Sequence, residues 1–440
     1  MKPLTKTAIL LTLMFLLVTQ FSCKQQPSSR NKKSPAPVAD VNLPSVDSVF
    51  NESVNTGHVA GGVVMMSQNQ KTTYWKSFGY SDKEAGRPMT GDAIFRITFM
   101  TAPITNTALM ILYDEGKFSL DDPVSKYIPE FKDPRVLKLS DELDTNGIPV
   151  SYTLEPATSE ISIRHLLTQT SGLTYTFYNH PFLSDMYRQA GISNGLDQRQ
   201  GTVGDMVKKL GKLPLHFNPG EKWHIGLNAD VVGYLVEVLS GQSLEVYLDQ
   251  HVFQPLGMKD TYFYVPDEKW NRIVSLYRPQ EDGSLIKYPP STQDIHGMIL
   301  TPSFDPRGPK TYFSGGAGLY STAADYSRFL QMLLNRGELD GTRVLTSETV
   351  QLMTTNQLGE LVFDMPGLAY GFGFYVQDQP IPVAKASSIG SYSWSGMFNT
   401  SFLVDPAMNM CYVVMCQHFP IGQFEVREKV DTQIYRNLLP

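Results

Sequence analysis

Serine hydroxyls placed three residues before lysines are the pattern in this chain that could perform nucleophilic chemistry. On a helix this spacing puts both side chains on one face, so the amine could take the hydroxyl proton and the oxygen could attack an acyl carbon. Ser29 with Lys32 lies in a Pro- and Ser-rich stretch, and Ser284 with Lys287 follows an Asp-Gly turn and precedes two prolines. A loop or short strand is expected at the second pair, and a strand would point its side chains to opposite faces. Neither pair is therefore predicted to be catalytic.

Thiols and imidazoles in this chain show no spacing typical of a metal site. Cys411 and Cys416 stand five residues apart in one apolar run, so on a strand they would face opposite sides of a sheet. We predict two buried free thiols rather than a disulfide. The eight histidines form no HExxH motif, and no paired CxxC motif occurs. No metal and no other cofactor is predicted.

The composition indicates a folded, slightly acidic protein. Of the 440 residues, 42% are hydrophobic and 18% are charged, which is enough apolar material for a large core. The 43 acidic residues outnumber the 37 Lys and Arg residues, giving a net charge of −6. Nucleic-acid binding needs a basic face, so we expect no nucleic-acid partner.

Residues 1–22 have the pattern of a secretory signal peptide. Lys2 and Lys6 precede an apolar stretch over residues 8–18, and this stretch is too short to span a bilayer comfortably. Ser22-Cys23 then resembles a bacterial lipobox, although Gln20 stands where an aliphatic residue is usual.

This resemblance implies that Cys23 is lipidated and becomes the mature N-terminus; ordinary secretion is the alternative. Residues 23–45 are rich in Pro, Ser and Lys and are predicted to form a flexible tether. We therefore expect an exported protein of the bacterial cell envelope that faces the periplasm or the exterior and contacts a membrane through its lipid anchor. The membrane leaflet and the oligomeric state stay open.

Patterns of hydrophobic residues predict one α/β domain over residues 46–440. Short β-rich runs occur near both ends of this range, at 61–68, 72–79, 370–376, 400–405 and 410–417, and a terminal helix is predicted at about 424–438. A helix is expected from about Pro103 to Gly116. The α/β part would comprise about 46–118 and 310–440, with a mainly helical insertion over about 119–309.

Several segments resemble the serine β-lactamase, penicillin-binding-protein and esterase family, of the type related to class C β-lactamases. The matching segments are FRITFMTAPITNTALMILYDEGKFSLDDPVSKYIPEF (95–131), ISIRHLLTQTSGLTY (161–175), FNPGEKWHIGLNADVVGYLVEVLSGQSLEVYLDQHVFQPLGMKDTYF (217–263), FSGGAGLYSTAADYSRFLQMLLN (313–335) and WSGMFNTSFLVDP (394–406). They follow the family's order and extend over most of 46–440. The resemblance implies a β-lactamase-like (DD-peptidase/transpeptidase-like) fold, in which an antiparallel sheet is flanked by helices and a helical domain adjoins it, with the active site in the cleft between.

The resemblance also locates three motif positions. In the family, a Ser-x-x-Lys motif supplies the nucleophile and its base, and a tyrosine from a second motif helps to move the proton. Flanks that match without a gap put Phe99 at the serine position and Ala102 at the lysine position, and Ile225 stands at the tyrosine position. The third motif is kept as Trp394-Ser395-Gly396. In the family it helps to bind substrate and supplies a backbone N–H to the oxyanion hole.

Three apolar replacements at the reacting positions predict a site without the family's chemistry. None of the new side chains can attack an acyl carbon or exchange a proton. In a serine protease, loss of one member of such a unit costs on the order of 10⁶ in rate. We therefore predict a pseudoenzyme of this serine hydrolase family; the alternative is an active esterase, peptidase or β-lactamase that uses other residues.

Backbone N–H groups do not depend on side-chain identity, so an oxyanion-hole geometry formed by Phe99 and the strand after Gly396 is expected to persist. On this hypothesis Phe99, Ala102, Ile225 and the Trp394-Ser395-Gly396 strand line a cleft that binds a peptide, an acyl compound or another cell-wall-derived small molecule. The alternative is that Phe99 fills the cleft and that any binding surface lies elsewhere.

Polar residues next to the replaced positions could act as new catalytic residues. Thr98 and Thr101 flank the lost nucleophile and His224 precedes the lost tyrosine, and a Thr–His pair could serve as nucleophile and base. A helix rotates adjacent positions by about 100°, so neither threonine is expected to point where the serine would. His224 is expected to face solvent or to cap a loop.

Overall fold

The computed structural model describes residues 42–197, 201–280, 282, 284–295, 298–301, 310–361, 363–380, 387–420 and 426–438. The predicted signal peptide, Cys23, the Ser29–Lys32 pair and most of the predicted tether lie outside these ranges. Helix α1 (Pro44–Asn55) begins within the last two residues of that tether. No helix in the described ranges is long and apolar enough to cross a membrane.

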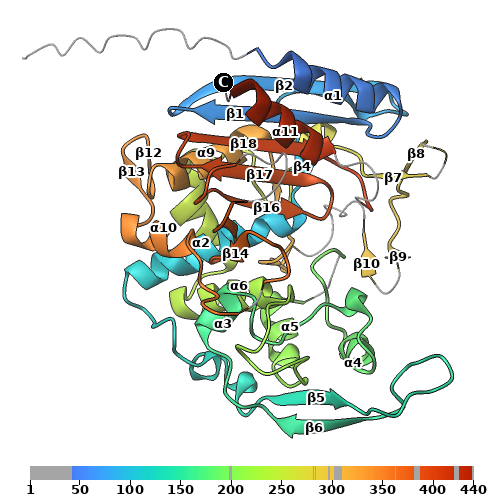
Figure 1. The fold of residues 1–440 in the computed structure, drawn as a ribbon, viewed down its shortest axis with the longest axis vertical. Helices are drawn as coiled ribbons and strands as arrows, with labels where there is room; N and C mark the ends of the chain where they lie inside the picture. The colour runs from blue at the N-terminus through green and yellow to red at the C-terminus, as the bar shows by residue number, and fades with distance from the viewer. Residues whose placement is uncertain are drawn as a thin grey trace, which may run out of the picture. The chain divides into compact units, whose positions relative to one another are not determined.

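One eight-stranded sheet is assembled from both ends of the chain, with strand order β14-β15-β16-β17-β18-β1-β2-β3 (Figure 1). Its strands are β1 (Gly61–Gln68), β2 (Lys71–Asp82), β3 (Arg87–Pro88), β14 (Leu368–Tyr370), β15 (Tyr375–Gln377), β16 (Tyr392–Gly396), β17 (Thr400–Asp405) and β18 (Met410–Cys416). All neighbours are antiparallel, and in the centre Val64 of β1 lies opposite Lys76 of β2 and Val414 of β18. The predicted antiparallel sheet is confirmed.

Helices cover both faces of the sheet. Helix α9 (Ala323–Leu334) packs on β1, β17 and β18. Its core cluster includes α2 (Thr101–Asp114) and Cys411. Helices α1 and α11 (Val426–Leu438) pack together over the other face, where Cys416 belongs to their cluster. The two thiols are thus buried on opposite faces, as predicted, and burial raises the pKa of each to about 12.

Local signals explain where the two inner helices start and stop. Pro103 sits in the first turn of α2, where a missing backbone N–H costs nothing. The chain leaves that helix through Gly116, whose φ of +70° suits a glycine. At the start of α9, the Thr322 hydroxyl accepts a hydrogen bond from the Asp325 N–H at 3.1 Å. Both helices are therefore held at defined positions against the sheet.

The region predicted as a mainly helical insertion also contains small sheets. Its helices are α3 (Ile163–Leu167), α4 (Leu183–Gln189), α5 (Val203–Leu210), α6 (Asn228–Ser240), α7 (Leu244–Leu248) and α8 (Gln254–Leu256), and its two-stranded sheets pair β5 (Arg135–Leu139) with β6 (Tyr152–Pro156), β7 (Tyr277–Pro279) with β8 (Leu285–Lys287) and β9 (Gln293–Ile295) with β10 (Met298–Leu300). The other strands and α-helix of the described chain are β4 (Phe95–Arg96), β11 (Tyr320–Ser321), β12 (Glu338–Leu339), β13 (Thr342–Arg343) and α10 (Ser347–Met353). Helix α6 packs against α2, α3, α5 and α7, so the insertion is joined to the sheet part through the α2–α6 contact.

Candidate functional site

A strained turn holds Phe99, the residue that the resemblance places at the nucleophile's position. Residues Thr98–Met100 form a 3-10 turn that leads directly into α2. Thr98 is fully buried and has a φ of +44°, which a β-branched residue rarely adopts and which costs about 1–3 kcal/mol. Its hydroxyl accepts a hydrogen bond from the Met397 N–H at 2.6 Å. The turn is therefore tied to the chain just after β16.

Strand β16 supports the same turn with its inward-facing residues. The buried Trp394 indole donates a hydrogen bond from Nε1 to the Phe99 carbonyl oxygen at 3.0 Å. A Cβ on Gly396 would lie 2.3 Å from the Ile97 carbonyl oxygen and 2.8 Å from Thr98 Oγ1. The structure thus brings Phe99, Trp394 and Gly396 together.

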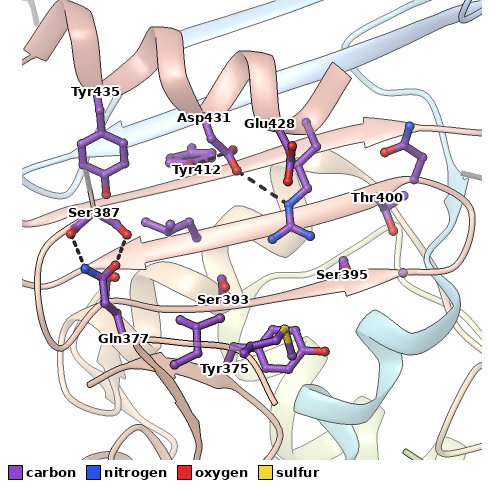
Figure 2. A pocket seen from close by; sticks show the side chains of 17 residues that line it. Tyr375, Gln377, Ser387, Ser393, Ser395, Thr400, Tyr412, Glu428, Asp431 and Tyr435 are labelled. Carbon is purple, nitrogen blue, oxygen red and sulfur yellow. Dashed lines mark hydrogen bonds and ion pairs between the residues drawn. The ribbon is translucent and has the colours of Figure 1, made fainter. Parts of the chain in front are cut away.

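Ser395 does not belong to this group, which corrects the prediction. Successive side chains of a strand alternate, and the burial pattern of β16 places Ser393 and Ser395 on the face opposite Trp394. Figure 2 shows both serines lining a different pocket, beneath α11. The motif therefore contributes Trp394 and Gly396 to one side of the sheet and Ser395 to the other.

The predicted oxyanion hole is also changed. Met397 is the first residue of the chain after Gly396, and its N–H already donates to the Thr98 hydroxyl. The prediction that the hole persists as an open site is therefore wrong for its strand donor, because the chain's own oxygen satisfies it.

Ala102 and Ile225 lie at the starts of two helices that pack against each other. Ala102 is buried in the first turn of α2, with 6% of its surface exposed. Ile225 is half-buried, precedes α6 by three residues, and packs with Phe99 against the same hydrophobic cluster. A lysine at position 102 would therefore need a polar partner to offset its desolvation. In this chain the apolar side chains of Ala102 and Ile225 take the place of such a lysine and its polar partner.

An aromatic stack runs outward from Phe99. The Phe99 ring lies 5.4 Å from Tyr175, Tyr175 lies 4.9 Å from Phe177, and Phe177 lies 5.1 Å from Tyr178. The stack ends at His224, whose ring is 4.7 Å from Tyr178. Tyr178 is 45% exposed, so the stack connects the buried turn with the protein surface. We call these five residues the aromatic stack.

The threonines beside Phe99 have structural partners. Thr98 Oγ1 binds the Met397 N–H, and Thr101 Oγ1 accepts from the Leu319 N–H at 3.1 Å. His224 is half-buried rather than solvent-facing, and its Nε2 lies 2.9 Å from the Thr174 hydroxyl. A Thr–His pair therefore exists, but it uses Thr174 and not a threonine of the turn. Thr174 is fully buried, which opposes contact between its oxygen and a substrate.

The Ser-x-x-Lys pair in the described chain is not a site. Ser284 precedes the short strand β8, and Lys287 at the end of that strand places its Nζ 2.7 Å from Asp82. Lys76, Lys126 and Lys269 likewise contact carboxylates. These lysines serve ion pairs on the surface.

Sequence reasoning missed a buried carboxyl behind the aromatic stack. Asp230 of α6 is fully buried and accepts a hydrogen bond from the Ser314 hydroxyl at 2.6 Å. Burial raises its pKa to about 6, against the opposing effect of the Ser314 hydrogen bond. A Cβ on Gly316 would lie 2.7 Å from Asp230 Oδ2 and 3.4 Å from the Tyr175 hydroxyl. The signal in the sequence was a single acidic residue, Asp230, in the otherwise apolar start of α6. Its carboxyl holds the glycine-rich loop that precedes β11 next to Tyr175.

We expect the protein to lose stability in acid through His216, which lies beside the stack. Its ring is 4.2 Å from His180 and 5.2 Å from His224, and burial together with these neighbours lowers its pKa to about 4. Unfolded histidine titrates near 6.5, so between pH 6.5 and 4 the unfolded chain binds a proton that the folded chain does not. Stability is therefore fully present above pH 6.5 and falls as the pH drops toward 4.

Thermal unfolding followed by circular dichroism from pH 7 to pH 4 measures this fall. In a His216→Gln variant the fall should be smaller than in the wild type. An identical pH dependence in the two proteins would contradict the assignment to His216.

Comparisons with known proteins agree with this architecture. The family model described as Beta-lactamase matches residues 46–435. Protein Rv1367c of Mycobacterium tuberculosis (strain ATCC 25618 / H37Rv) is 33% identical over 391 residues, covering 86% of this chain and 91% of the relative. Esterase EstB of Burkholderia gladioli is 31% identical over 382 residues, covering 84% of this chain and 89% of EstB. The solved structure of EstCE1, described as a hydrolase with promiscuous acyltransferase activity, matches with a TM-score of 0.75 at 25% identity, covering 89% of this chain and 98% of that one. The predicted fold class is thereby confirmed.

Proposed function

This chain belongs to the β-lactamase family, and from that premise we propose that it is a member without acyl-enzyme chemistry that binds acyl or peptide ligands at the cell envelope. The observation that carries the proposal is the turn before α2. Phe99 stands at the nucleophile's position, and the Thr98 hydroxyl lies 2.6 Å from the Met397 N–H. An acyl-enzyme route would lack the attacking oxygen and would find its strand oxyanion donor already bonded.

The aromatic stack supports the binding half of the proposal. Apolar and aromatic surfaces recognise acyl chains and peptide side chains through buried area, with no need for a reacting carbonyl. Phe99, Phe177 and Tyr178 present partly exposed rings beside the half-buried Ile225. The ligand is therefore proposed to lie along these rings rather than in an oxyanion hole.

Covalent labelling tests the absence of acyl-enzyme chemistry. We expect no mass increment after incubation with a fluorophosphonate or a labelled penicillin, measured by intact mass spectrometry. A serine esterase that forms a fluorophosphonate adduct, treated in parallel, serves as the positive control. A stoichiometric adduct on this chain would overturn the proposal, and peptide mapping would then identify its nucleophile.

Ligand binding can be measured by thermal shift against D-amino-acid peptides, muropeptides and medium-chain acyl esters. We expect a stabilising shift for at least one class, reduced in Phe177→Ala because a face of the stack is removed. Tyr152→Ala, which removes an exposed ring on β6, is the matched control. A complete lack of shifts would remove the binding half of the proposal and favour the alternative that Phe99 only fills the site.

The Thr174–His224 pair favours a second candidate, an active hydrolase with non-standard residues. The 2.9 Å contact suits a nucleophile and its base, and burial lowers the pKa of His224, so the imidazole is neutral at pH 7. The full burial of Thr174 opposes this function, because a substrate carbonyl must come within about 3.5 Å of the attacking oxygen. A labelled adduct that maps to Thr174 and vanishes in Thr174→Val would establish this candidate in place of the first.

We also propose that Cys23 carries a lipid and that the protein is held at the bacterial envelope. The support is the sequence pattern of residues 1–23, which leads into a polar tether. Metabolic labelling with an alkyne fatty acid should mark the wild-type chain and fail to mark Cys23→Ala. Labelling of the variant, or release of an unlabelled wild-type chain into the medium, would favour ordinary secretion.

A further inference from the structure

Asparagine stands directly before glycine at two places in this chain, and the fold holds the two pairs in opposite surroundings. Asn146-Gly147 forms part of the loop that joins β5 to β6, whereas Asn194-Gly195 lies among buried residues of the insertion. Figure 1 shows the β5–β6 loop at the edge of the described chain, away from the eight-stranded sheet. The same dipeptide is therefore exposed in one place and enclosed in the other.

Such a pair can modify itself by an intramolecular cyclisation. The backbone nitrogen of the glycine attacks Cγ of the asparagine, so the N–Cγ bond forms, the Cγ–Nδ2 bond breaks, and the amide nitrogen leaves as ammonia with the proton of the attacking N–H. Water then adds to the cyclic imide and opens one of its two C–N bonds, which leaves either aspartate or isoaspartate. Glycine favours this attack because it has no Cβ to crowd its nitrogen. Water is the only co-reactant, and nothing is oxidised or reduced.

The loop that carries Asn146 is short and open to solvent. The Asp144 N–H donates a hydrogen bond to the Ile148 carbonyl oxygen at 2.8 Å, and the Gly147 N–H donates to the Asp144 carbonyl oxygen at 3.0 Å. With a φ of +76° at Gly147, this is the pattern of a type I turn closed by a glycine in the left-handed region. Every residue from 141 to 148 is exposed, so water reaches both the side-chain amide and the imide.

The Asp144 carboxylate restrains this loop. Its Oδ1 accepts hydrogen bonds from the Ile148 N–H at 2.9 Å and from the Asn146 N–H at 2.8 Å, and these two bonds lower the pKa of Asp144. Hydrogen bonds at an exposed hairpin tip open at little cost in free energy. The Gly147 nitrogen is therefore bonded while the loop is closed and becomes available for attack each time the loop opens.

Asn194 is held by buried partners at both reacting groups. Its side chain is 3% exposed, its Oδ1 accepts from the Thr176 N–H at 3.1 Å, and its Nδ2 donates to the Thr176 hydroxyl at 2.6 Å. The attacking nitrogen is fixed as well, because the Gly195 N–H donates to Ser193 Oγ at 3.0 Å. Freeing these groups requires a buried part of the insertion to open, which costs far more free energy than opening a hairpin tip.

We infer that Asn146 is a site of spontaneous modification, at which the Gly147 nitrogen displaces the side-chain amide to give aspartate and isoaspartate, while Asn194 stays intact in the folded protein. The inference is independent of the proposed function, because the β5–β6 loop contains neither Phe99 nor any member of the aromatic stack.

The products change the loop in two ways. Each adds a negative charge beside the three acidic residues at 141, 142 and 144. Isoaspartate also routes the backbone through the former side chain and lengthens it by one carbon, so the turn geometry that gives Asp144 its two N–H donors is lost. The modified hairpin tip is therefore more acidic and less ordered than the original one.

Peptide mapping by mass spectrometry, on the full chain incubated at mildly alkaline pH, tests this inference. We expect the amide-to-acid mass change at Asn146 to appear at least tenfold faster than at Asn194, with isoaspartate detected by enzymatic methylation. Gly147→Ala should slow the reaction at least tenfold, because its methyl group crowds the attacking nitrogen. Asp144→Ala should speed it about threefold or more by releasing the loop. Asp141→Ala removes the same charge from the same tip and should react as the wild type does.

Equal rates at Asn146 and Asn194 in the folded wild-type chain would overturn the inference, and so would an Asn146 that stays intact while both pairs react in the chain unfolded by urea. Both comparisons use the wild-type sequence alone, so they decide the matter whatever the variants do. A wild-type rate in Asp144→Ala would overturn the restraining role given to that carboxylate.

Discussion

Fast reaction of this protein with an active-site label is expected only when four positions are changed, whereas a change of three should give slow reaction. The variant Phe99→Ser, Ala102→Lys, Ile225→Tyr restores the nucleophile, the base and the proton shuttle that the family uses. It leaves the Thr98 hydroxyl on the Met397 N–H at 2.6 Å, so the oxyanion of a tetrahedral intermediate still lacks its strand donor. Adding Thr98→Ala frees that N–H. Since loss of one such donor costs about 10²–10³ in rate, the quadruple variant should react with a fluorophosphonate roughly 100-fold faster than the triple variant.

The rate of adduct formation, followed by intact mass spectrometry, measures this difference. Thr98→Ser in place of Thr98→Ala is the control, because it keeps a hydroxyl at the same Cβ and should leave the triple variant slow. Equal rates in the triple and quadruple variants would show that Thr98 does not close the hole. A folded quadruple variant with no adduct would contradict the assignment of Phe99, Ala102 and Ile225 to the reacting positions.

Replacing Gly396 by alanine should destabilise the fold by about 3 kcal/mol or more. The added Cβ would lie 2.3 Å from the Ile97 carbonyl oxygen and 2.3 Å from Thr400 Oγ1, and the first of these atoms belongs to a buried backbone that cannot move away freely. The strained turn at Thr98 is held against the same strand. The strain of Thr98 and the clash at Gly396 would therefore both weaken the contact between this turn and β16.

Urea unfolding measures this loss. Gly390→Ala is the matched control: Gly390 lies just before β16, its φ is +86°, and no atom lies within 4 Å of an added Cβ, so only the backbone cost of about 1–2 kcal/mol applies. A Gly396→Ala protein as stable as the Gly390→Ala protein would mean that β16 and the turn separate easily.

The parts of the fold that could be predicted are the strands and helices whose own hydrophobic pattern identifies them. Alternating and continuous apolar runs located β1, β17 and β18, and the positions of Cys411 and Cys416 on opposite faces followed from the twofold repeat of a strand. Hairpin β5–β6 was missed because every residue of β6 is exposed, so no buried face produces a periodic signal.

The residues of the candidate site were predicted by resemblance and stay a prediction, whereas their geometry could not be predicted. A gap-free match located Phe99, Ala102 and Ile225, and alternation along β16 could have separated Ser395 from Trp394 and Gly396. No pattern of residues indicates that Thr98 adopts a φ of +44° and turns its hydroxyl onto the Met397 N–H. That geometry depends on the packing of two segments distant in sequence, which short-range rules do not describe.

The pairing of β1 with β18 has a consequence for how this polypeptide is made. Strand β1 leaves the ribosome early, and its partner β18 follows almost at the end of synthesis. Until then the middle of the sheet has an open apolar edge, and contacts between such distant segments form slowly. We expect the sheet of the nascent chain to stay open until β18 has been made, and a stop codon just ahead of residue 410 to prevent this sheet from closing.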